Sequence, residues 1–517
     1  MPTVSQSSTR STLFRVTPIK IAIVSCVGLY LLLAIPLSFP IKNFCGDEGF
    51  YALAARNVMQ GVKPYRDFLY PQMPLMAYAY AAWFSIFGMS VESGRVLSLT
   101  MTALAITFVM LACHRRVGLW PAVLAGLLWS TAIYTATDLG FMKSQSLCNF
   151  LIAAALLAIP TPDADRRLAR AALAMGLMSL AFFTRLTLVI PLFVLWVYLA
   201  WECRSEITRY LLLVAANIAI LAIVIAFFWS DGNMWFGVYV THHDFYGDGP
   251  WTWERLGWTV TYSLRNQLVI ATFLLAAVIR FCGLLTDRST WPELAFPTFC
   301  LGCYAAVTLA HWSQVQNYPT HQTVITSFAI AFIALVLAPV IKVVAERHLV
   351  SGGIGLALFV AICSPFSEGG IAPLIDRAGK HDWLKEALGI LARHAKPGDE
   401  MLSFNVELAF HGGYSVFPGC EASEWSYLAA VPDEVAEKRK VLNWPRLVAA
   451  IREEKPPLLI FTDREFDFMN VGGIEHAEQF GALILEHYSQ VGVVEKYGQF
   501  GLELFIFKRI GKLPKQE

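Results

Sequence analysis

Apolar runs long enough to cross a lipid bilayer recur through the first two thirds of this chain. A bilayer core of about 30 Å requires roughly 20 apolar residues in a helix. One run, 171–201, is too long for a single helix and contains Arg185 near its middle, so we expect two short spans that break at 184–187. With that division the sequence predicts about 11 transmembrane helices. The apolar runs are 18–40, 93–113, 118–137, 144–160, 171–201, 209–229, 263–282, 294–311, 322–341 and 349–365.

Charged residues divide the chain into two parts. Of the 79 Asp, Glu, Lys and Arg residues, 39 lie in the last 147 positions, from Ile371 onward. The distribution predicts a short N-terminal segment at 1–17, a transmembrane domain at 18–370 and a water-soluble domain at 371–517. The net charge of +1 indicates no strongly acidic or basic partner and no nucleic acid.

The last part of the chain has the pattern of an α/β domain. Residues 382–394 have helical spacing of apolar positions, and the stretches 401–405 and 457–461 resemble buried strands. Within this part we find no glycine-rich loop of the kind that binds nucleotides.

The basic residues of the loops predict the orientation. Arg10, Arg15 and Lys20 come before or at the start of the first span, which favours a cytoplasmic N-terminus in a plasma (inner) membrane. The amphipathic run 74–88 is expected to lie at the interface without spanning. With that assignment the basic loops face the cytoplasm, while the first loop, 41–92, and the soluble domain are extracytoplasmic.

This first outer loop has the most informative sequence. It places Asp47 and Glu48 just after the first span and follows them with the segment 64–71, which contains Arg66 and Tyr70. Carboxylates at a membrane surface, beside an aromatic and basic loop, suit a reaction on a lipid-borne substrate. The alternative is a capped, solvated loop without chemistry.

The motifs of this loop, G-D-E-G-F-Y, A-R-N and P-Y-R-D-F-L-Y-P, resemble the first periplasmic loop of the GT-C superfamily. The nearest resemblance is to protein O-mannosyltransferase-like enzymes, glycosyltransferase family 39 and its bacterial relatives. Weaker blocks agree in order: R-V-L-S-L at 95–99, G-L-M-S-L-A-F-F-T-R-L-T at 176–187, and H-W-S-Q-V-Q-N-Y-P-T-H at 311–321. The resemblance covers about residues 15–345 and leaves the C-terminal domain out.

The resemblance implies a multi-span helical glycosyltransferase that moves a sugar from a polyprenyl-phosphate carrier to an extracytoplasmic glycan, lipid or protein. It implies that Asp47 is the general base for the acceptor hydroxyl. Glu48 is the second catalytic candidate. Because adjacent side chains point in different directions, we expect Glu48 to hold a loop, a metal or the acceptor. A divalent metal is a possible cofactor.

The leaving group of such a reaction is a phosphate, so cations are expected where its charge develops. Arg185 is the first candidate, because a cation inside an apolar stretch is costly and indicates function. A snorkelling or paired structural arginine is the alternative. Weaker candidates for binding substrate or phosphate are Arg66, Tyr70, Asp138, Lys143, His311 and Tyr318, with Gln316 and His321 nearby.

Each weaker candidate has a simpler interpretation. Arg66 could pair with Asp67 or Asp47, and Asp138 could pair with Lys143. The aromatic and histidine residues of the loop 311–321 could anchor the chain at the interface. In the loop 230–262, the sequence H-H-D at 242–244 suggests a metal, but adjacent histidines seldom ligate one metal well. An aromatic surface for sugar or lipid is the preferred interpretation there.

Two other functions remain open from the sequence. A transporter or flippase of a lipid-linked precursor would also need many spans and a buried arginine. No inverted repeat is visible in the apolar runs, which counts against it. The third possibility is a non-catalytic relative that keeps the fold as a binding component.

Overall fold

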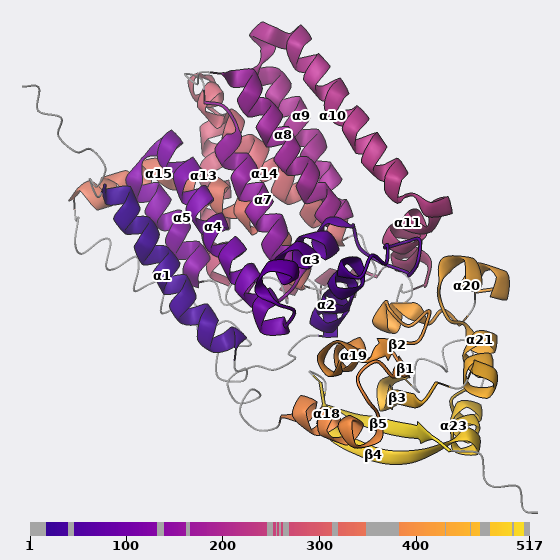
Figure 1. Ribbon diagram of the computed structural model, residues 1–517. Helices are drawn as coiled ribbons and strands as arrows, with labels where there is room; N and C mark the ends of the chain where they lie inside the picture. The colour runs from indigo at the N-terminus through magenta and orange to yellow at the C-terminus, as the bar shows by residue number, and fades with distance from the viewer. Residues whose placement is uncertain are drawn as a thin grey trace, which may run out of the picture.

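The computed structural model of the chain contains a bundle of long helices and a smaller sheet domain at one end of it (Figure 1). It describes residues 17–39, 46–131, 139–161, 166–245, 252–254, 256–257, 260–261, 268–312, 319–347, 382–429, 431–454, 456–465, 476–498 and 501–510. The expected domain boundary at 370/371 and the expected span 349–365 lie outside these residues.

Among the described residues, six helices are long and apolar enough to cross a membrane. They correspond to α1 (Pro18–Ser38), α4 (Val91–Val117), α8 (Arg167–Thr184), α10 (Ile207–Phe228), α14 (Trp291–Trp312) and α15 (Thr326–Arg347). Four shorter apolar helices coincide with other expected spans: α5 (Leu119–Thr131), α7 (Ser144–Ala158), α9 (Val189–Glu202) and α13 (Leu268–Leu285). The protein is therefore a multi-pass membrane protein, and the total of 11 spans stays a prediction.

The run 171–201 is broken at the predicted place. Helix α8 ends at Thr184, Arg185 is extended with a φ of −150°, and the 3₁₀ turn η1 (Leu186–Leu188) leads into α9. Pro191 lies in the first turn of α9, where its missing N–H costs no helical hydrogen bond. The break leaves Arg185 on irregular backbone between two apolar helices.

The helices differ in what surrounds them. Helix α10 lies at the edge of the bundle and exposes apolar side chains such as Leu212, Ile223 and Phe227 (Figure 1). A helix that is apolar on its outer face matches a lipid environment. In α15, by contrast, Phe328, Phe332 and their neighbours are buried among other helices. The bundle thus has a packed centre and a lipid-facing edge.

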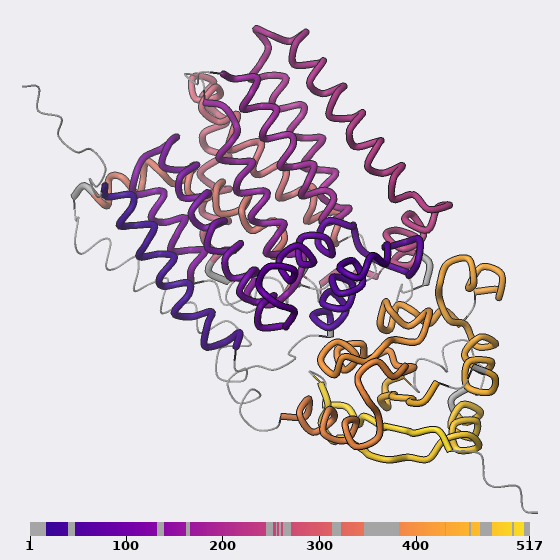
Figure 2. The backbone as a smooth tube through the Cα atoms, viewed as in Figure 1, coloured from indigo at the N-terminus to yellow at the C-terminus, as the bar shows by residue number. Residues whose placement is uncertain are grey.

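Two helices of the first loop, α2 (Gly46–Met59) and α3 (Leu75–Phe87), lie between the bundle and the sheet domain (Figure 2). Helix α3 has 13 residues, about 20 Å at 1.5 Å per residue, which is shorter than a bilayer core. Its buried side, with Met76, Tyr80 and Phe84, faces the protein. Since α5 is equally short, length alone does not decide the matter, and the interfacial position of 74–88 stays a prediction.

The C-terminal domain is a five-stranded sheet in the order β2-β1-β3-β5-β4. The strands are β1 (Glu400–Ser403), β2 (Ser415–Val416), β3 (Leu458–Thr462), β4 (Tyr488–Tyr497) and β5 (Leu502–Arg509). Strands β2, β1 and β3 run parallel, and β5 and β4 complete the sheet as antiparallel neighbours. The helices are α18 (Trp383–His394), α19 (Val406–Gly412), α20 (Asp433–Arg439), α21 (Trp444–Ala449) and α23 (His476–His487).

The local sequence explains the first of these helices and the central strands. Asp382 caps α18 by accepting a hydrogen bond from the Lys385 N–H at 3.1 Å, and the apolar positions Leu384, Ala387 and Leu391 face the sheet. Strand β3 is buried at every position, as expected for a strand covered on both faces. The helix and the two strands anticipated here from sequence are all present.

A buried carboxyl group lies where β3 ends. Glu465 accepts hydrogen bonds from the Thr462 N–H at 2.5 Å and from the Asn405 side-chain amide at 2.9 Å. Burial raises the pKa of Glu465 from 4.5 to about 8. Between those two values the folded protein binds a proton that the unfolded chain releases, so stability is lost as the pH rises through this window.

We therefore predict that the sheet domain unfolds at lower urea concentration at pH 8 than at pH 5. Glu465→Gln, which stays uncharged, should reduce this dependence between about pH 4.5 and 8; Glu421, whose pKa burial raises to about 7, contributes to the remainder. Pulse proteolysis of the full-length protein in urea measures it, with Glu503→Gln at an exposed position of β5 as the control. An unchanged slope in Glu465→Gln would rule out this carboxyl as the source.

Candidate functional site

A buried ion pair joins the first loop to the bundle. Glu48 in α2 accepts hydrogen bonds from Arg95 of α4, at 2.9 Å from Nε and 2.5 Å from Nη2. Their side chains are 1% and 2% exposed. Burying two charges is costly unless their remaining hydrogen-bonding atoms are also satisfied.

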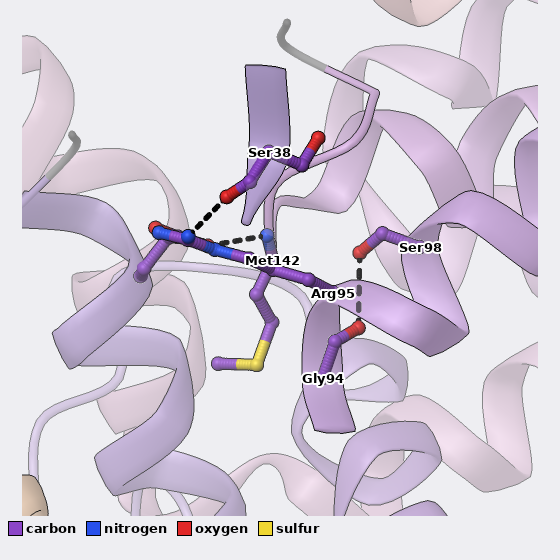
Figure 3. A network of polar contacts seen from close by, with 6 residues as sticks. Ser38, Gly94, Arg95, Ser98 and Met142 are labelled. Carbon is purple, nitrogen blue, oxygen red and sulfur yellow. Dashed lines mark hydrogen bonds and ion pairs between the residues drawn. The ribbon is translucent and has the colours of Figure 1, made fainter. Parts of the chain in front are cut away.

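The surrounding groups meet that requirement (Figure 3). Arg95 Nη1 donates to the Ser38 carbonyl at the end of α1, and the Met142 N–H donates to Glu48 Oε1 at 2.9 Å. The Phe141 ring lies 4.8 Å from the guanidinium carbon. The pair therefore holds together α1, α2, α4 and the segment before α7, and the Glu48 carboxylate is engaged in holding the loop.

Asp47 has a different environment from its neighbour. It lies in the first turn of α2 and is exposed, whereas Glu48 is buried. A negative charge in the first turn is favoured by the helix dipole. The two adjacent carboxylates thus point to different surroundings, and Asp47 is the one that is exposed.

The start of α7 brings polar groups into the bundle. Lys143 is the buried N-cap residue, and Ser144, Gln145 and Ser146 follow it, all buried. Within the described part of the chain, Ser144 Oγ and Gln145 Oε1 have no hydrogen-bond partner. A helix N-terminus with a lysine beside it attracts anions, because its N–H groups and its dipole both favour negative charge.

Arg185 lies near this helix. Its charge interacts electrostatically with Cys148 of α7, with His242 and with His311 at the end of α14. Cys148 is five residues along α7 from Lys143, or about 8 Å at 1.5 Å per residue. Met142, which directly precedes Lys143, donates its N–H to Glu48. The start of α7 therefore lies between Glu48 of α2 and Arg185.

His242 connects three parts of the chain. It lies on the π-helix η4 (Phe236–Phe245), a conformation found often at functional sites. Its Nε2–H donates to the Pro71 carbonyl at 2.7 Å, and its ring centre is 4.5 Å from that of Trp425 in the C-terminal domain. Burial lowers the pKa of His242, so the ring is neutral near pH 7 and the Pro71 bond leaves Nδ1 as an acceptor.

Arg66 and Tyr70, which the sequence suggested as substrate-binding residues, contact other groups of the protein. Arg66 is exposed and pairs with Asp67 at 2.8 Å, one of the two partners considered from sequence. Tyr70 is fully buried, and its ring is stacked on Phe50 of α2 with the centres 5.4 Å apart. Tyr70 therefore belongs to a buried aromatic cluster that packs the first loop against α2.

Several candidates cannot be placed. Asp138, Gln316 and Tyr318 lie outside the described residues, as does the side chain of His321. Among the residues that the structure does describe, no group of three His, Cys, Asp or Glu side chains is arranged to hold a metal ion.

Sequence reasoning overlooked Arg95, Ser144, Gln145 and the contact of His242 with Pro71. Arg95 had a visible signal, since a cation near the start of an apolar run requires a partner. The α7 residues carried only the weak signal of polar side chains at the start of a span. For His242 the deciding partner is 171 positions away, which no local pattern reveals.

Comparisons with known proteins identify the fold. No protein-family model and no curated protein matches the chain. Among solved structures, ArnT from Cupriavidus metallidurans in the apo state aligns with a TM-score of 0.63 at 13% identity, over 95% of this chain and 98% of that one. The same enzyme bound to undecaprenyl phosphate aligns at 0.59 and 13% identity, over 96% and 99% of the two chains.

The Archaeoglobus fulgidus oligosaccharyltransferase in its apo form aligns with a TM-score of 0.52 at 13% identity, over 98% of this chain and 76% of that one. The chain therefore shares the fold of these proteins, in agreement with the resemblance of the loop motifs to the GT-C superfamily. At this identity the likeness establishes the fold and leaves the activity to be argued from the site.

The buried ion pair leads to a stability prediction. Glu48→Leu or Arg95→Met alone should destabilise the protein by about 3–5 kcal/mol, because each leaves an unpaired buried charge. The double variant should recover part of that loss. Thermal unfolding of the detergent-purified protein measures both effects.

The control for this comparison is Arg209→Gln, which breaks an exposed pair with Glu206. It should cost less than about 1 kcal/mol. A double variant that is as unstable as the sum of the single variants would contradict the assignment of a coupled pair.

Proposed function

We propose that this protein is a membrane glycosyltransferase that moves a sugar from a polyprenyl-phosphate donor to an extracytoplasmic acceptor. The observation that carries the proposal is the placement of Arg185 on the broken helix beside His242 and His311, near the buried start of α7. ArnT and the oligosaccharyltransferase that share the fold have been solved with undecaprenyl phosphate and with a dolichol-phosphate, respectively.

In this proposal the donor phosphate occupies the cationic end of the bundle. Arg185 and Lys143 supply positive charge, and the α7 N-terminus supplies backbone donors. Negative charge grows on the phosphate oxygen as its bond to the anomeric carbon breaks. Fixed cations that face this oxygen stabilise the transition state more than the ground state.

Asp47 supplies the other half of the reaction. The acceptor hydroxyl attacks the anomeric carbon, its oxygen forms the new glycosidic bond, and its proton passes to the Asp47 carboxylate. The polyprenyl phosphate leaves from the opposite face of the sugar, so the configuration inverts. Glu48 contributes by fixing the start of α2 through Arg95.

Asp47→Asn should abolish sugar transfer while the protein remains folded, since an amide cannot accept the proton. Membranes supplied with labelled polyprenyl-phosphate sugars give the measurement. Asp287→Asn, an exposed helix-capping position far along the chain, is the matched control and should transfer normally. Normal transfer by Asp47→Asn would eliminate the catalytic assignment.

The same variants test the transporter alternative. A proteoliposome flipping activity that survives Asp47→Asn but disappears in Arg185→Ala would identify a flippase. A protein with neither transfer nor flipping, but with lipid binding that depends on Arg185, would be the non-catalytic relative.

The proposal also places the first loop and the C-terminal domain outside the cytoplasm. The two parts lie at the same end of the bundle, so one measurement orients both (Figure 2). A cysteine introduced at exposed position 503 should react with a membrane-impermeant thiol reagent added to the outside of intact cells. The native Cys420 cannot serve, because it is fully buried. Labelling only after the cells are opened would reverse the topology.

A further inference from the structure

The short helix α19 joins the two halves of the molecule (Figure 1). Its residues Val406 and Phe410 belong to the apolar core of the bundle, and Leu408 and Ala409 belong to the core of the sheet domain. The Phe410 ring lies 6.2 Å from that of Phe84 in α3. A helix buried on two opposite sides transmits the position of one domain to the other, because close-packed interiors deform little.

The tightest contact of α19 is with α2, next to Asp47. A Cβ atom added to Gly49 would lie 2.4 Å from Glu407 Cβ and 2.7 Å from Glu407 Cα. Real Cβ atoms do not approach backbone atoms this closely, so only glycine lets the two helices meet here. Gly49 is two residues from Asp47, within the same turn of α2.

The other end of α2 is held by Arg56. Its guanidinium donates to the carbonyls of Ala409 and Tyr414 in the C-terminal domain, each at 3.0 Å. The side chain is 7% exposed, and burial lowers its pKa. The Ala409 carbonyl lies in the last turn of α19, where the negative end of the helix dipole favours a cation, and Tyr414 follows directly after the C-cap residue Gly413.

A second bridge fixes the neighbouring loop. Asn233 donates to the carbonyls of Tyr65 at 3.0 Å and Lys438 at 3.2 Å, and its own side-chain oxygen accepts from Arg439 at 2.7 Å. The first loop is therefore tied to the C-terminal domain both through α2 and through Asn233.

We propose that the C-terminal domain sets the position of the catalytic carboxylate, with Gly49 and Arg56 as the positioning residues. This inference rests on the proposed function, because it assigns the contact to the work of Asp47. It gives the domain a role in the chemical step, distinct from recognition of the acceptor. Neither residue touches the substrate; both act through the placement of α2.

The test uses the full-length protein in proteoliposomes with a labelled polyprenyl-phosphate sugar. Gly49→Ala and Arg56→Gln should lower kcat by about 10- to 100-fold, since small misplacements of a catalytic group carry that cost. KM for the donor should stay unchanged, because the phosphate site lies on other elements. Arg56→Lys, which keeps the charge and can reach one carbonyl, should recover part of kcat.

Matched controls are Gly389→Ala, a helical glycine of α18 with open space around its Cβ position, and Arg393→Gln, an exposed arginine of the same helix. Both should have normal kcat. If Gly49→Ala does not fold, the comparison of Arg56→Gln with Arg56→Lys decides. Normal kcat in Arg56→Gln, while Asp47→Asn is inactive, would overturn the inference and leave the proposed function standing.

Hydrogen exchange in α2 covers the case in which the catalytic assignment of Asp47 fails. If Asp47→Asn transfers sugar normally, Asp47 is not the general base and the positioning inference falls with that assignment, while the transferase activity itself stands. Hydrogen exchange in α2 then still reports on the contact, and Arg56→Gln should accelerate it. Unchanged exchange together with unchanged kcat would show that Arg56 does not position α2 at all.

Discussion

The buried pair of Glu48 and Arg95 is the interaction on which the attachment of the first loop to the bundle depends. Two charges removed from water must find all their partners within the protein, and here the partners come from four segments. That requirement fixes where α2 begins relative to α1, α4 and α7. Because Asp47 precedes Glu48 directly, the same pair fixes the start of the catalytic candidate's helix. An exposed pair such as Arg66 and Asp67 could not do this, since solvent screens it.

From that fixed point, polar groups extend into the bundle along α7 to Arg185. Polar side chains inside a membrane protein are costly, and here they gather at one end of the helices. The helix breaks after Thr184, which leaves Arg185 on extended backbone, and its charge acts on His242 and His311.

The C-terminal domain completes the arrangement from the other side. Its sheet is an ordinary mixed α/β sheet, but α19 is buried against both the sheet and the first loop. The contact depends on Gly49, where any side chain would meet backbone, and on Arg56, whose charge is met by carbonyls. The domain is thereby part of the support of the first loop, which the loop motifs gave no reason to expect.

The sequence by itself determined the membrane-spanning character, the break at Arg185, the α/β nature of the last domain and the likeness of the first loop to the GT-C superfamily. The first three follow from composition and from the periodicity of apolar residues. The likeness to the GT-C superfamily rests on the resemblance of the loop motifs. The sequence also separated Asp47 from Glu48, since adjacent side chains diverge. Only the tertiary structure decided which groups the buried polar side chains contact. Glu48 pairs with Arg95, His242 donates to Pro71, and Arg56 donates to carbonyls of α19 and the residues that follow it. Those contacts join residues between 47 and 358 positions apart, and packing selects them from many chemically equivalent groups.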